Sequence, residues 1–137
     1  MKERRFFVDN FSLITVQNQM LAEQAACEIR ACNSVSEKYG LSLTEDQITE
    51  LVECRKDALK KTGRVEFGGG ILPKLIYAFC DSEYIDEENY ESTLAELQEA
   101  FYYLKNEFRD TYSDDELIEY MVEKFNGTAH GQVGDLL

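Results

Sequence analysis

The spacing of apolar positions along this chain predicts helices over most of its length. From about Asn18 to Tyr39, apolar side chains recur at three- and four-residue steps, which is the pattern of an amphipathic helix. Gly40 follows them, at the place where a helix commonly ends in a left-handed residue. Residues 1–17 are partly apolar but fit neither the helical nor the strand period. We therefore expect a long first helix, preceded by an irregular segment or a short strand.

Two capping boxes predict where two further helices begin. Thr44-Glu45-Asp46-Gln47 and Ser113-Asp114-Asp115-Glu116 each place a hydroxyl residue three positions before an amide or a carboxylate. In this motif the two side chains satisfy backbone N–H groups that the first turn of a helix leaves without partners. The apolar stripes that follow are closed by Gly63 and by Asn126-Gly127, so we expect one helix between each pair of signals.

Two more helices are expected between these. One begins near Leu72, with Pro73 in its first turn, where the missing N–H costs nothing. The other opens at Asp86, which can cap it. Its apolar stripe is very regular and consists of Tyr90, Leu94, Leu97, Phe101, Leu104 and Phe108. The chain is therefore predicted to be mainly α, a compact bundle of four to five helices with a Gly-rich break at 68–70.

Length and composition favour one folded domain. A chain of 137 residues that is 44% hydrophobic and 12% aromatic is too apolar to be a disordered acidic chain. We expect residues 1–127 to form this domain. Residues 128–137 offer few apolar anchors, so they are expected to be a mobile C-terminal tail.

The cysteines and the apolar runs indicate a cytoplasmic protein. The four cysteines show no C-x-x-C spacing and read as reduced thiols in or beside the core. The longest uncharged stretch, Asn10–Ala22, is too short and too polar to span a bilayer. No membrane contact is therefore expected.

The stretch Gly63–Ile85, which reads GRVEFGGGILPKLIYAFCDSEYI, resembles a small family of uncharacterised bacterial proteins. The resemblance extends from about Leu41 to Phe125 and includes the second capping box with Leu117 and Ile118. It implies a bacterial cytosolic protein, and it implies nothing about mechanism.

Negative charge is confined to the C-terminal end of the chain. Residues 1–80 hold eleven basic and eleven acidic side chains, whereas residues 81–137 hold three basic and sixteen acidic ones, and so carry the whole net charge of −13. Such asymmetry indicates that one surface meets something positive.

Two helical faces concentrate this charge around tyrosines. The first comprises Glu96, Glu99, Tyr103 and Glu107, and the second comprises Glu116, Glu119, Tyr120 and Glu123. Carboxylates steer and orient a cationic partner, and an aromatic side chain supplies an anchor. We therefore expect a non-enzymatic interaction module that binds a basic protein partner or a second copy of itself. A narrower version is nucleic-acid mimicry, in which carboxylates stand in for phosphates.

The alternative is a ligand-binding protein or enzyme centred on the triple glycine, because backbone N–H groups at a helix start bind phosphates. The residues of this alternative are Arg64, Glu66, Gly68, Gly69, Gly70 and Lys74. The stretch departs from a P-loop, which requires Gly-Lys followed by Ser or Thr. The explanation that we favour for the glycines is a sharp corner in the chain, or a place where two backbones touch.

Other chemistry finds little support. The acidic runs lack the glycine and the final glutamate of a calcium loop, and one histidine, His130, excludes a multi-histidine zinc site. No cofactor or metal is expected. The net charge of −13 disfavours direct nucleic-acid binding. The chain also contains a basic cluster, which consists of Arg55, Lys56, Lys60, Lys61, Arg64 and Lys74. We expect this cluster to face the acidic helices, either within one molecule or across the interface of a homodimer.

Overall fold

The computed structural model describes residues 20–68 and 70–137, and within these residues it contains helices and no strand. A first helix covers residues 20–31 of the described chain. The elements that follow are α2 (Asn33–Ser36), the 3-10 helix η1 (Glu37–Tyr39), α3 (Glu45–Thr62), α4 (Leu72–Phe79), α5 (Tyr90–Glu107), α6 (Asp114–Asn126) and the 3-10 helix η2 (Val133–Leu136). The predicted helical bundle is confirmed, whereas the expectation for residues 1–17 lies outside the described residues.

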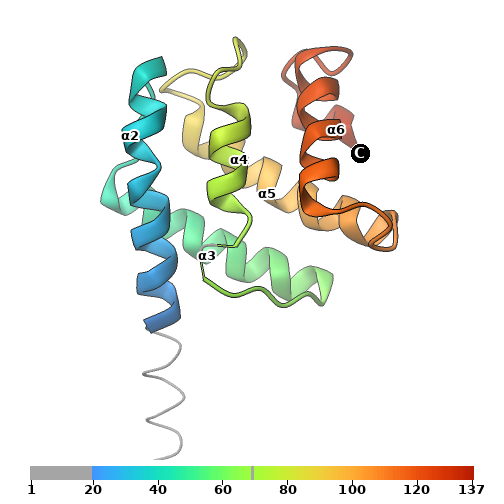
Figure 1. The fold of residues 1–137 in the computed structure, drawn as a ribbon, viewed down its shortest axis with the longest axis horizontal. Coiled ribbons are helices and arrows are strands. Elements are labelled where there is room, and N and C mark those ends of the chain that lie inside the picture. The colour runs from blue at the N-terminus through green and yellow to red at the C-terminus, as the bar shows by residue number, and fades with distance from the viewer. Residues whose placement is uncertain (1–19, 69) are drawn as a thin grey trace, which may run out of the picture.

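The helices form two layers (Figure 1). The first helix with α2, then α4, and then α6 stand side by side in one layer, and α3 and α5 run across behind them. α3 and α5 make the most extensive contact between helices and run in the same general direction. The core between the layers contains buried apolar side chains from the first helix and from α3, α4, α5 and α6, including Ile29, Leu51, Leu75, Leu97 and Met121.

Local signals in the sequence account for most helix ends. Both capping boxes form with their two reciprocal hydrogen bonds, so α3 begins after Thr44 and α6 after Ser113. Gly40 and Gly63 adopt the left-handed conformation expected after a helix, with φ of 76° and 68°. These features depend on residues within four positions of each other, which is why the sequence predicts them well.

The start of α5 differs from the prediction. The sequence places it at Asp86, whereas the helix begins at Tyr90. The Asp86 carboxylate accepts the backbone N–H of Asn89, and the Asn89 side chain accepts the backbone N–H of Asp86, both at 2.9 Å. This reciprocal pair closes a turn of its own ahead of the helix, so Asp86 does not cap the helix.

A buried polar network fixes the connection between α3 and α4. Glu66 Oε1 accepts hydrogen bonds from Arg55 Nε at 3.1 Å and from the Tyr102 hydroxyl at 2.5 Å. It also accepts the backbone N–H of Ile71 at 3.3 Å, and Arg55 Nη1 donates to the Gly68 carbonyl at 2.8 Å. Arg55 lies in the buried stripe of α3 and therefore pairs with a carboxylate from the segment that follows this helix. The break predicted at the glycines lies in this connection.

The C-terminal residues are folded against the helices. The sequence predicts a mobile tail over 128–137, whereas Ala129, Val133 and Leu136 are buried and η2 packs on α5 and α6. Gly131 N–H also donates to the carbonyl of Phe125 at 2.8 Å. Three small or aliphatic side chains are enough to seat this segment because they enter a surface that α5 and α6 have already formed.

We predict that Gly70→Ala destabilises the protein more than Gly63→Ala. Both glycines have left-handed φ values, of 62° and 68°, which cost alanine about 1–2 kcal/mol. A Cβ on Gly70 would also clash with Glu66 Oε1 and lie 2.7 Å from Arg55 Nε, whereas a Cβ on Gly63 meets nothing within 4 Å. The clash adds a further ~1–3 kcal/mol. Urea unfolding of both variants measures this, and equal losses would contradict the close packing of the network.

Candidate functional site

Internal ion pairs leave most of the predicted acidic faces unneutralised. Lysines and arginines of the basic cluster pair mainly with carboxylates outside those faces: Arg64 with Asp110, and Lys74 with Asp115. Within residues 20–68 and 70–137, Glu99 is the one member of the two faces in an ion pair, at 3.8 Å from Lys61 with both side chains exposed. Among the described residues, the other carboxylates of the two faces therefore keep their negative charge without an ion-pair partner.

The structure brings the α6 face into a pocket beside the turn that joins α5 to α6. We call this the turn pocket. It has a volume of about 320 Å³ and is lined by Phe108, Tyr112, Glu116, Leu117, Glu119, Tyr120 and Glu123. All four predicted α6 residues are among them. The pocket thus combines aromatic walls with three carboxylates.

Two edge-to-face contacts order the aromatic walls. The ring of Phe108 lies 5.3 Å from that of Tyr112 at an interplanar angle of 84°, and 6.0 Å from that of Tyr120 at 89°. Such perpendicular pairs are a favoured aromatic geometry. Tyr112 and Tyr120 remain 46% and 40% exposed, so both rings stay accessible to a ligand.

The turn between α5 and α6 has a strained backbone, and the side chains of Arg64 and Lys105 hold it in place. Arg109 and Asp110 have positive φ values of 52° and 57°, which are uncommon for residues other than glycine. Arg64 binds both Asp110 carboxylate oxygens, at 2.5 and 3.2 Å, and Lys105 Nζ donates to the Tyr112 carbonyl at 2.8 Å. Lys105 Nζ also pairs with Asp114 at 2.9 Å. These contacts position Tyr112 across from Phe108.

The α5 face lies outside this pocket. None of its four described residues lines the turn pocket. Tyr103 is 46% exposed, and its hydrogen bond with Glu107 raises the pKa of the Tyr103 hydroxyl. The two faces that the sequence treats as equivalent therefore differ, because only the α6 face lies against additional aromatic side chains.

Two residues of the pocket, Phe108 and Tyr112, are absent from the site predicted from the sequence. The sequence assigns Phe108 to the core stripe of α5, and it is in fact only partly buried. Tyr112 stands immediately before the capping box and in front of Leu117. An aromatic residue next to a helix start was the signal that could have indicated it.

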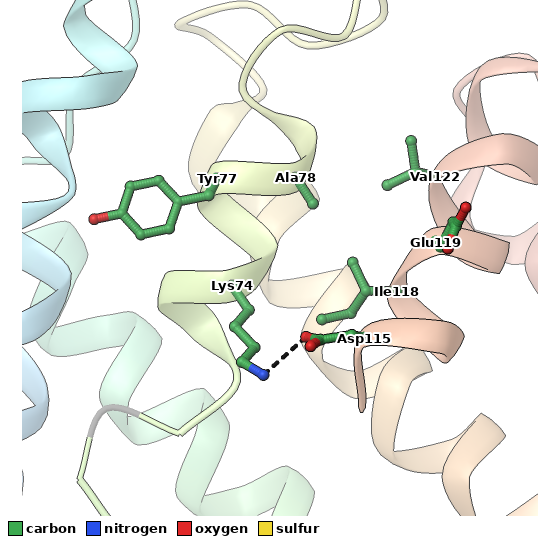
Figure 2. Close-up of a pocket in the computed structure, with 7 residues that line it drawn as sticks. All are labelled: Lys74, Tyr77, Ala78, Asp115, Ile118, Glu119 and Val122. Carbon is green, nitrogen blue, oxygen red and sulfur yellow. Dashed lines mark hydrogen bonds and ion pairs between the residues drawn. The ribbon is translucent and has the colours of Figure 1, made fainter. Parts of the chain in front are cut away.

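A shallow groove lies between α4 and α6 (Figure 2). It has a volume of about 410 Å³, and Ala78, Ile118 and Val122 form its apolar walls. The ion pair between Lys74 and Asp115 crosses one end at 2.8 Å, and Tyr77 points away from α6. Glu119 lines both the groove and the turn pocket, so one α6 carboxylate borders two neighbouring hollows.

Of the described residues of the Gly68–Gly70 alternative, Glu66 and Gly68 line the same pocket, whereas Arg64, Gly70 and Lys74 do not line it. This pocket has a volume of about 240 Å³ and is also lined by Arg55. Arg64 is directed to Asp110 and Lys74 to Asp115.

The polar groups at this loop mainly satisfy each other. Glu66 accepts three hydrogen bonds from within the protein, and burial next to that carboxylate raises the pKa of Tyr102, so its hydroxyl stays protonated and donates. Gly70 gives space to this network. The close approach of backbone and side chains is therefore sufficient to explain a glycine here.

Among the described residues, no three histidine, cysteine, aspartate or glutamate side chains are grouped in a way that could hold a metal ion. None of the helices in the same part of the chain combines the length and apolarity needed to cross a membrane. His130 lies beside Tyr84, with 3.4 Å between Nδ1 and the hydroxyl.

The fold and the turn pocket define an all-helical protein with an anionic surface lined by aromatic side chains. Residues 28–137 match the family of unknown function DUF6323, and the chain belongs to this family. The resemblance noted around the triple glycine lies within the matched residues. No curated protein and no solved structure matches the chain.

We predict that Asp110→Asn lowers stability at neutral pH and that its effect fades in acid. Arg64 holds the pKa of the Asp110 carboxyl below its ordinary value of 3.8. A depressed folded-state pKa contributes stability above the unfolded-state value, and this contribution is lost as the pH falls through the folded-state value. Asparagine tolerates positive φ, so the substitution mainly removes charge. Urea unfolding at pH 7 and pH 3 should show a difference from wild type that shrinks at pH 3. A difference that does not depend on pH would contradict this account of the turn.

Proposed function

We propose that this protein is a non-enzymatic interaction module that binds a basic protein segment at the turn pocket and the adjoining face of α6. One observation carries the proposal: Glu116, Glu119 and Glu123 surround accessible aromatic rings, and none of the three is in an ion pair within the described residues. Such a surface supplies both attraction for cations and an apolar contact area.

The charge distribution supports a partner of positive charge. Residues 81–137 contain sixteen acidic side chains and only three basic ones. A field of this kind accelerates encounter with a cationic partner and weakens as salt screens it, over about 10 Å at 0.1 M. The tyrosines provide the desolvated contacts on which affinity depends. Carboxylates that replace phosphates on a nucleic-acid-binding protein are a special case of the same proposal.

The thiols support a reducing compartment as the place where this occurs. Cys27 and Cys54 are exposed and free, and Cys32 and Cys80 are buried and free. Exposed free thiols are typical of cytosolic proteins. The proposal therefore places the module in the cytoplasm.

We predict that reversing charge on α6 abolishes partner capture. Glu119→Lys with Glu123→Lys changes the charge of the turn pocket by four units and leaves the core untouched. Proteins captured by the immobilised wild type at low salt should be lost at high salt and lost with this double variant. Quantitative mass spectrometry of the captured fractions measures both effects. Thermal stability should change little, because exposed substitutions usually alter the free energy of unfolding by about 0.5 kcal/mol or less.

The matched control is Glu37→Lys with Asp57→Lys. Both residues are exposed, and within the described chain neither is in an ion pair. This variant has the same net charge as the α6 variant but leaves the turn pocket intact, so capture should persist. Equal losses in the two variants would show a general charge effect and would contradict the assignment to α6. Light scattering of the wild type distinguishes binding of another protein from self-association, in which exposed lysines of α3 would meet α6 of a second copy. A mass above that of one chain would show self-association.

A further inference from the structure

We infer that the turn pocket receives the guanidinium group of an arginine side chain from the partner. This inference rests on the proposed function and names the chemical group that the site selects.

The aromatic walls suit a flat cation. Tyr112 and Tyr120 each lie nearly perpendicular to Phe108, at 84° and 89°, so the pocket has ring faces and ring edges in defined directions. A guanidinium is planar and more weakly hydrated than an ammonium, and it stacks on aromatic faces. One cation already uses this aromatic cluster: Lys124 Nζ lies 5.7 Å from the Tyr120 ring centroid, and Lys124 does not line the pocket.

The carboxylates suit a group with several donors. Glu116, Glu119 and Glu123 occupy positions three, four and seven residues apart, which brings them to one side of α6. Hydrogen bonds from the backbone N–H and the side chain of Ser113 lower the pKa of the Glu116 carboxyl, so it is charged at neutral pH. A guanidinium offers five N–H donors in a fixed plane and can bridge two carboxylates, whereas an ammonium acts as a point charge.

The pocket is formed before any ligand arrives. Arg64 and Lys105 fix the turn that carries Tyr112, and the capping box fixes the start of α6. Ordering costs on binding are therefore small, since the strained backbone is already held. The charge complementarity between three carboxylates and a cation decides in favour of a basic side chain over an apolar one.

The test uses three small compounds with the full-length protein. Nα-acetyl-arginine-N-methylamide is titrated into ¹⁵N-labelled protein, and the shifts of amide signals are followed. The corresponding derivatives of lysine and citrulline are titrated in the same way. The lysine compound tests whether the shape of the cation matters, and the citrulline compound, an uncharged isostere of arginine, tests whether its charge matters. We expect shifts centred on residues 108–123 with the arginine compound, weaker binding of the lysine compound, and no saturable binding of the citrulline compound.

Two pairs of variants locate the binding. Tyr120→Leu and Glu123→Gln should each weaken binding of the arginine compound by about three- to fivefold, the range expected for one exposed cation–π contact or one charge. Tyr103→Leu and Glu99→Gln make the same chemical changes on the α5 face, outside the pocket, and should leave binding unchanged. Tyr103 is 46% exposed and Tyr120 is 40% exposed, so the pair is matched in accessibility.

Each outcome distinguishes this inference from the proposed function. The guanidinium assignment would be overturned if the citrulline or the lysine compound bound as tightly as the arginine compound. It would also be overturned if the variants on the α5 face lost as much affinity for the arginine compound as the variants in the turn pocket. If those results occur while the α6 charge reversal still abolishes capture, the module function stands without the arginine pocket. If the arginine compound binds as expected while capture survives the reversal, the pocket stands and the proposed function fails.

Discussion

The candidate site depends on two cations that hold the turn between α5 and α6. Arg64 reaches from the connection after α3 to both carboxylate oxygens of Asp110, and Lys105 binds the Tyr112 carbonyl and Asp114. Arg109 and Asp110 adopt a backbone conformation that costs about 1–2 kcal/mol per residue unless the surroundings compensate. Because these contacts determine where Tyr112 lies, part of the basic segment serves to shape the acidic one.

This arrangement explains why so acidic a protein retains a defined anionic surface. The internal cations are directed to the turn, to Glu66 and to the first turn of α6, where Lys74 meets Asp115. They stabilise the connections between helices and leave Glu116, Glu119 and Glu123 facing the turn pocket. The same distribution accounts for the close approach of Gly68 and Gly70 to the hydrogen-bonded pair of Arg55 and Glu66.

The sequence predicted what depends on neighbouring residues and missed what depends on distant ones. Capping boxes and left-handed glycines act within four positions, so the bounds of α3 and α6 could be read directly. The α6 half of the site followed from helical spacing alone. Tyr112 and Phe108 could not be assigned to it, because their meeting requires the turn that Arg64 holds from more than forty residues away. The seating of Val133 and Leu136 likewise depends on a surface built by α5 and α6.

The central claim is that α6 and the turn present a site for a cationic protein segment. The most direct measurement is selection of peptides from a random display library on the immobilised protein, followed by mapping of the best peptide with ¹⁵N-labelled protein. The account predicts that selected peptides are enriched in arginine and that amide shifts centre on the turn pocket. Selected peptides without cationic residues, or shifts centred on α3 and Gly68, would contradict it.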